Sequence, residues 1–186
     1  GRDEIDMLDP SRHFLGYCPN AQMQFDFPAP IHLWEEKGIG VALGTDAACC
    51  NDTMNVQLEM RNLAAAQLFA IPHSREYRSF SHDPTILPSQ RVRARREAIF
   101  NGSVQNANPE KVLSSVWSVP GSLHPGYQCG VIAPGYRANL TIFDLDHPVF
   151  WPGYDPLRSL AYSNVAPAIH AMIINGKWRG EPGNFH

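Results

Sequence analysis

A short, uninterrupted apolar run constrains this chain more than any other segment. Residues 40–44 read Gly-Val-Ala-Leu-Gly, and Thr45 and Asp46 follow directly. A strand that is apolar at every position is typical of a parallel strand buried on both faces. We expect an amphipathic helix over residues 53–69, because apolar residues recur there at helical spacing. This strand and helix predict an α/β fold with Asp46 at the carboxyl end of a parallel strand.

The remaining periodic segments supply further elements. We expect helices over residues 3–8, 31–37, 90–100 and 109–117, and strands over residues 13–19, 138–144 and 168–174. The pair Asn175-Gly176 is a strong hairpin signal, with a return strand from Lys177. Residues 72–89 are polar and rich in proline, which predicts a long surface loop.

Local signals predict which side chains are buried and where the central helix begins. Ile31 and Trp34 are expected to face inward from the helix over residues 31–37, as are four apolar residues of the helix over residues 109–117: Val112, Leu113, Val116 and Trp117. Residues 47–52 are expected to form a loop, with Asp52 capping the helix that follows.

Charge and hydropathy exclude several classes of partner. The 186 residues carry a formal net charge of −3, so no positive field would attract nucleic acid. No apolar run approaches the roughly 20 residues that a membrane helix needs, and residues 1–10 do not resemble a secretory leader. The four cysteines are few and irregularly placed, which favours reduced thiols. We expect a cytoplasmic protein.

Asp46 is the main candidate for chemistry. In a β/α barrel, functional side chains lie at the carboxyl ends of the strands. An aspartate after a strand also serves as a helix cap or turn former, so both interpretations of Asp46 stay open at this point. Cys49 and Cys50 lie just beyond it and are either substrate contacts or small loop residues.

A longer pattern around Asp46 resembles the amidohydrolase superfamily, in particular its aromatic deaminases and triazine-type hydrolases. The pattern runs over residues 38–52 and continues over residues 58–61. Further segments are similar to the same family in the same order: residues 17–19, 28–34, 109–123, 130–140, 154–157 and 173–177. The resemblance implies the C-terminal portion of a longer enzyme, with the last units of a TIM-type (β/α) barrel over residues 1–119. A β-rich segment over residues 120–186 would add strands of a small composite β-sandwich.

The resemblance also implies an activity. It indicates a metal-dependent hydrolase of non-peptide carbon–nitrogen bonds in a small-molecule substrate, such as a deaminase of a cyclic amidine or heteroaromatic amine. Asp46 matches the family's last-strand aspartate, which is catalytic, binds the divalent metal and takes a proton from the attacking water. Zinc is the expected metal, with iron and manganese as alternatives. Tyr17 and Cys49 are expected to contact the substrate, although Tyr17 stands where deaminases of this branch often have a histidine.

The metal site is expected to be incomplete in this chain. The eight histidines include no His-x-His pair, and a catalytic zinc needs about three protein ligands. We therefore expect an enzyme in its full-length form and no activity from this chain alone. Open strand edges and apolar faces predict a homo-oligomer or association with the missing barrel half. The alternative is a non-catalytic assembly domain, or a degenerate barrel remnant without a metal site.

Overall fold

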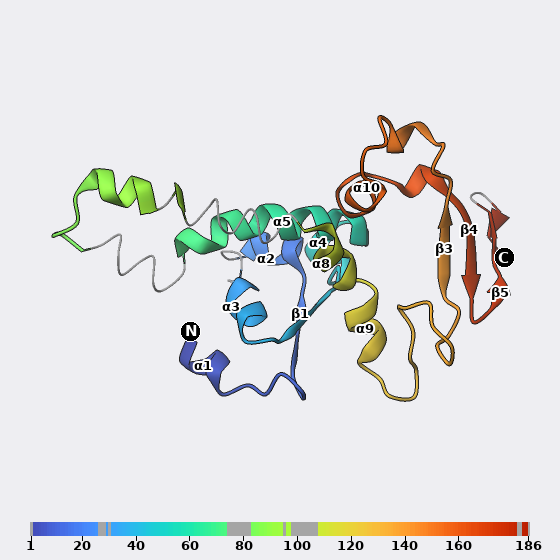
Figure 1. The fold of residues 1–186 in the computed structure, drawn as a ribbon, viewed down its shortest axis with the longest axis horizontal. Coiled ribbons are helices and arrows are strands. Elements are labelled where there is room, and N and C mark those ends of the chain that lie inside the picture. The colour runs from blue at the N-terminus through green and yellow to red at the C-terminus, as the bar shows by residue number, and fades with distance from the viewer. Residues whose placement is uncertain are drawn as a thin grey trace. The chain divides into compact units, whose positions relative to one another are not determined.

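The chain folds into two compact units, which we describe separately. The computed structural model describes residues 2–25, 29, 31–73, 83–94, 96–97, 108–181 and 184–185. One unit spans Gly1–Asn108 and the other Pro109–His186 (Figure 1). Both combine helices with small sheets, so the α/β class predicted from the sequence is confirmed.

The first unit is built around two parallel strands. Strands β1 (Phe14–Tyr17) and β2 (Gly40–Leu43) pair in register, with Tyr17 opposite Leu43. The named helices of this unit are α1 (Arg2–Asp6), α2 (Pro19–Phe25), α3 (Ile31–Glu36), α4 (Ala48–Asn51) and α5 (Val56–His73). Helices α2 and α3 lie between the two strands in the sequence, as the crossover between parallel strands requires.

The structure of the first unit confirms the predicted central strand but differs from the prediction in the elements around it. Val41 and Ala42 are buried in β2, as the continuous apolar run predicts. The predicted loop after Asp46 contains the short helix α4, and α2 has no counterpart in the prediction. In α3 the buried partner of Ile31 is Leu33, whereas the predicted Trp34 is only partly buried.

The start of α5 also differs from the prediction. Asp52 does not cap this helix; it ends α4 in a left-handed conformation, with φ of 53°. The capping side chain is that of Asn55, whose Oδ1 accepts a hydrogen bond of 3.0 Å from the Gln57 amide. Both residue types favour helix caps, and only the course of the backbone after α4 selects between them.

The second unit contains an antiparallel sheet and short helices. Its helices are α8 (Pro109–Ser114), α9 (Ser118–Ser122) and α10 (Pro156–Tyr162), with 3₁₀ turns at Pro148–Phe150 and Ala166–Ala168. Strands β3 (Leu140–Phe143), β4 (Ile169–Ile174) and β5 (Lys177–Trp178) form one antiparallel sheet, and β6 (Gly180–Glu181) pairs with β7 (Asn184–Phe185). Phe150, Val165 and Ala168 form the buried centre beside the sheet.

The structure of the second unit confirms the predicted hairpin, but one predicted helix is shorter than expected. Asn175 and Gly176 connect β4 to β5 with φ of 51° and 73°, as a two-residue type I′ turn requires. The helix predicted over residues 109–117 ends at Ser114. Val116 is therefore only partly buried, and Trp117 is 44% exposed rather than buried. Because α8 packs against α10, the compact units divide after Asn108. The predicted boundary between the barrel part, which ends at residue 119, and the β-rich segment, which begins at residue 120, stays a prediction.

The part of the first unit that follows α5 is described only in part. Residues 88–94 and 96–97 are helical where the sequence predicts a helix over residues 90–100. The predicted loop over residues 72–89 is helical at its ends, in α5 up to His73 and again from residue 88, and residues 74–82 and 98–100 lie outside the described residues. No helix in the described part of the chain combines the length and the apolar character that crossing a bilayer requires.

Candidate active site

The carboxyl ends of β1 and β2 bring two chain segments together. The pairing of Tyr17 with Leu43 continues through a 2.9 Å hydrogen bond from the Gly44 amide to the Tyr17 carbonyl oxygen. A Cβ atom at Gly44 would lie 3.2 Å from Cys18 Sγ, so the absence of a side chain allows this close approach. The residues just beyond each strand are therefore neighbours, as the parallel arrangement requires.

Asp46 projects from this edge in an unusual backbone conformation. Its φ is 59°, in the left-handed region that few residues other than glycine adopt. The carboxylate is exposed, and Oδ1 accepts a 2.7 Å hydrogen bond from the Ala47 amide. Backbone strain of this kind concentrates at functional sites, where the surrounding structure maintains it. Asp52 and Asn175 also have a positive φ, so it is the position of Asp46 beyond the end of β2 that singles it out as a candidate functional residue.

Asp46 and Tyr17 line one cavity of about 280 Å³. Gly16, Cys18, Ala21 and Gln22 complete its lining. The structure thus brings together two of the three predicted site residues. Cys49 is not among the lining residues: it is exposed on α4, with its Sγ 3.7 Å from that of Cys50.

Cys18 and Gln22 are lining residues that the sequence prediction does not include. The signal for Cys18 is its position immediately after β1, where a barrel strand delivers functional side chains. Gln22 lies on α2, a helix that the apolar pattern does not predict. Its place in the lining becomes visible only with the structure.

Burial raises the pKa of both ionisable neighbours of Asp46, which further favours their protonated forms. Burial raises the pKa of the Tyr17 hydroxyl above its usual value, against a smaller lowering by the Ala29 backbone. Burial likewise raises the pKa of the Cys18 thiol, and a hydrogen bond with the Asp46 backbone opposes this in part. Tyr17 can therefore donate a hydrogen bond, and Cys18 is not an activated thiolate.

The donors near Asp46 do not complete a metal site. Among the described residues, no group of three or more histidine, cysteine, aspartate or glutamate side chains is placed to hold an ion. The bond to Ala47 uses one oxygen of the Asp46 carboxylate, and the other oxygen can serve a ligand. The donor set thus suits one ligand of a divalent metal rather than a whole coordination shell.

Comparison with known sequences gives relatives that are longer than this chain. A 5-methylthioadenosine/S-adenosylhomocysteine deaminase from Syntrophomonas wolfei is 30% identical over 181 residues, which cover 94% of this chain and 34% of the relative. The chain thus spans about a third of the length of the curated relatives it matches. This coverage fits the prediction of a portion of a longer enzyme. No protein-family model matches the chain.

Solved structures share the fold. An adenosine deaminase from Xanthomonas campestris with bound zinc aligns with a TM-score of 0.75 and 17% identity, over 100% of this chain and 36% of that chain. A triazine hydrolase variant aligns with a TM-score of 0.74 and 18% identity, over 100% of this chain and 35% of that chain. The predicted resemblance to deaminases and triazine-type hydrolases is confirmed.

Proposed function

We propose that this chain forms part of a metal-dependent hydrolase of non-peptide carbon–nitrogen bonds, within the amidohydrolase superfamily that its residue patterns resemble. The proposed substrate is a heteroaromatic amine or a cyclic amidine. The relative from Syntrophomonas wolfei bears the name of an adenosine-type deaminase, so an aminopurine nucleoside is the first substrate to test. The observation that supports the proposal best is the shared cavity of Asp46 and Tyr17 at the carboxyl ends of two parallel strands.

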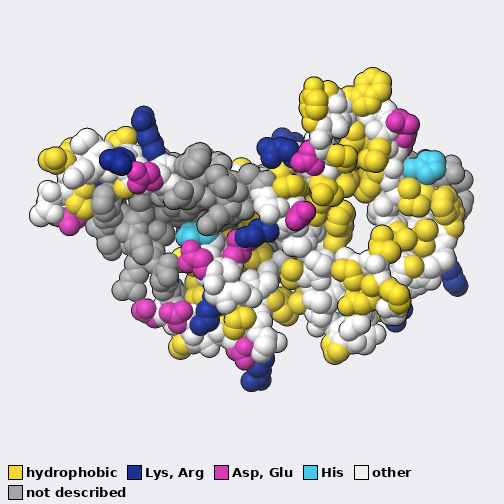
Figure 2. Space-filling model, in the orientation of Figure 1, with side chains coloured by type: hydrophobic (Ala, Val, Ile, Leu, Met, Phe, Trp, Pro, Cys, Tyr) yellow, Lys and Arg dark blue, Asp and Glu magenta, His cyan; other side chains and the backbone are white. Residues whose placement is uncertain are grey.

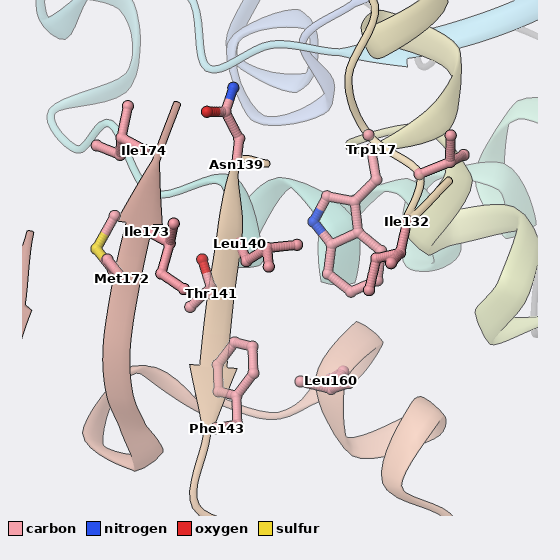
Figure 3. Close-up of a pocket in the computed structure, with 12 residues that line it drawn as sticks. Trp117, Ile132, Asn139, Leu140, Thr141, Phe143, Leu160, Met172, Ile173 and Ile174 are labelled. Atoms are coloured by element: carbon pink, nitrogen blue, oxygen red, sulfur yellow. The ribbon is translucent and has the colours of Figure 1, made fainter. Parts of the chain in front are cut away.

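The proposed architecture is a partial barrel with strands of a composite β-sandwich. The parallel pair β1–β2, with helices between its strands, has the pattern of consecutive barrel units. In the second unit, a cavity of about 400 Å³ is lined mainly by apolar side chains of β3, β4 and the segment near Trp117. Figure 3 shows Leu140 pointing from β3 towards Trp117 across this cavity. On the face drawn in Figure 2, apolar side chains cover much of this unit, as a surface that packs against further strands would.

The proposed chemistry assigns a role to two side chains of the cavity, Asp46 and Tyr17. Asp46 accepts a proton from the attacking water and returns it to the departing nitrogen, so the carbon–nitrogen bond breaks while a carbon–oxygen bond forms and ammonia leaves. The protonated Tyr17 hydroxyl donates a hydrogen bond to a ring nitrogen of the substrate and orients the ring. Cys49 remains a candidate substrate contact from α4, outside the cavity lining of this structure.

A divalent metal is the proposed cofactor, and zinc is the first choice among zinc, iron and manganese. The Xanthomonas campestris neighbour holds zinc. Asp46 would supply one ligand, and the others would come from outside the described residues. When bound, the metal would lower the pKa of the attacking water from about 15.7 towards about 7.

The test is a substitution of Asp46 in the full-length protein. Asp46→Asn keeps the size of the side chain and removes the proton acceptor, so we expect the rate of ammonia release from an aminopurine nucleoside to fall by about 10²–10⁴-fold. Asp52→Asn is the matched control, because Asp52 is also exposed and also has a positive φ. Equal rates in the two variants would remove Asp46 from the mechanism.

Association is the remaining part of the proposal. The exposed apolar residues of the second unit include Ile132, which is 89% exposed, and Trp178, which is 56% exposed. Such surface is costly in water, so we propose that it packs in a homo-oligomer or against the rest of the longer protein. Light scattering on the 186-residue chain tests this, and a stable monomer at all concentrations would contradict it.

A further inference from the structure

Glu59 is a buried carboxylate that the proposed chemistry does not use. It lies on α5 and has 0% of its surface exposed. Its Oε2 accepts a 2.9 Å hydrogen bond from the Asn20 amide, and its Oε1 accepts a 2.6 Å bond from the Asn51 side-chain amide. A buried carboxylate is retained at such a position only when hydrogen bonds offset its loss of water.

Asn51 links Glu59 to the backbone next to Asp46. The same Nδ2 group that donates to Glu59 also donates a 2.6 Å hydrogen bond to the Thr45 carbonyl oxygen. That carbonyl belongs to the peptide unit that leads directly into Asp46. Asn51 is itself 3% exposed, so water cannot easily replace these bonds.

Asn20 closes the network from the side of β1. Its side-chain amide donates to Asn51 Oδ1, and its own Oδ1 accepts a 3.1 Å bond from Asn62 Nδ2. Asn20 lies in the first turn of α2, just beyond Cys18. The network therefore joins the segments that follow both strands to a single helix, α5.

We propose that Glu59 is a positioning residue that acts through Asn51 and the Thr45 carbonyl to hold Asp46 in its left-handed conformation. An aspartate with φ of 59° is in a sparsely populated region, and such a conformation persists only where neighbouring contacts maintain it. The Thr45 carbonyl is the contact that the network supplies. The catalytic consequence of this inference rests on the proposed function, whereas the structural part does not.

The variants differ in how much of the network they remove. Glu59→Ala deletes both acceptors. Glu59→Gln keeps the volume but turns one acceptor into an amide nitrogen, which faces a donor. Asn51→Asp keeps the volume and removes the donor to Thr45, while placing a second carboxylate against Glu59. Leu63→Ala is the matched control, because Leu63 is buried one turn along α5 and contributes apolar packing.

Amide hydrogen exchange of the 186-residue chain tests the structural part. We expect Glu59→Ala and Asn51→Asp to accelerate exchange over residues 44–52 by at least about tenfold, and Glu59→Gln by less. Leu63→Ala should not accelerate exchange there beyond its effect on the rest of α5. Unchanged exchange in the Glu59 and Asn51 variants, or equal acceleration by Leu63→Ala, would overturn the inference. If Glu59→Ala does not fold, Glu59→Gln and Asn51→Asp still decide the outcome.

Kinetics of the full-length protein test the catalytic part. We expect Glu59→Gln to lower kcat for ammonia release by about tenfold or more with KM changed by less than about twofold, since the misplaced group is the proton acceptor. A loss confined to KM, or no loss, would contradict the positioning role. If Asp46→Asn also leaves turnover unchanged, the proposed function fails instead, and the exchange result still stands by itself.

Discussion

Gly130 in the second unit gives a prediction whose size can be worked from the structure. Its φ is +81°, and a Cβ atom there would lie 2.0 Å from the Trp117 carbonyl oxygen and 2.5 Å from its carbonyl carbon. Both contacts are to backbone, which cannot rotate away as a side chain can. Gly130→Ala therefore combines an unfavourable conformation with an overlap that requires the chain near Trp117 to shift.

The expected cost is the sum of two parts. A left-handed conformation costs a residue with a Cβ atom about 1–2 kcal/mol, and overpacking a closely packed region costs about 1–3 kcal/mol. We expect Gly130→Ala to lower the free energy of unfolding by about 2–5 kcal/mol. Gly135 has a similar φ of +88° with nothing within 4 Å of the added atom, so Gly135→Ala should cost only about 1–2 kcal/mol.

Urea unfolding followed by tryptophan fluorescence measures the difference. Three of the four tryptophans lie in the second unit, so the signal reports mainly on that unit. The comparison of the two variants cancels the effect of alanine on the unfolded chain, which both share. Equal unfolding free energies, within about 0.5 kcal/mol, would refute the reasoning from the Trp117 contact.

Three further predictions concern cysteine reactivity, the pH dependence of stability and metal binding. Alkylation near neutral pH should modify Cys49 before Cys18, because Cys49 is exposed whereas burial raises the pKa of the Cys18 thiol; mass spectrometry showing the reverse order would contradict the structure. Burial raises the pKa of Tyr17 in the folded chain, so its contribution to stability is complete below about pH 10 and is lost as pH rises through the folded pKa. Tyr17→Phe should remove part of this alkaline loss in unfolding experiments, and an unchanged pH profile would refute the role of Tyr17. Zinc or a chelator should shift the melting temperature of the 186-residue chain by less than about 1 °C, because the described residues contain no three-ligand group; a large shift in a melting scan would reveal one.

Elements with strong local signals are those that the sequence predicts well. The apolar run before Thr45 can only be buried as a strand, and Asn175-Gly176 has the backbone freedom that a tight hairpin turn needs. The placement of Asp46 at a strand end follows from the same run. Its neighbour Tyr17 follows from the parallel pairing with β2.

Features that depend on tertiary contacts are those that the sequence does not reveal. Asn55 rather than Asp52 caps α5, because the backbone after α4 places the asparagine at the helix start. The burial of Glu59 contradicts the polar character of its residue type, and only the donors from Asn20 and Asn51 account for it. Trp117 is exposed because α8 ends three residues before it.

The most direct test of the Asp46 assignment is a crystal structure of the full-length protein, with anomalous diffraction recorded at the zinc edge. We predict a zinc peak about 2.0–2.2 Å from an Asp46 carboxylate oxygen. A bound zinc ion elsewhere, with Asp46 bonded only to the Ala47 amide as it is here, would contradict the assignment.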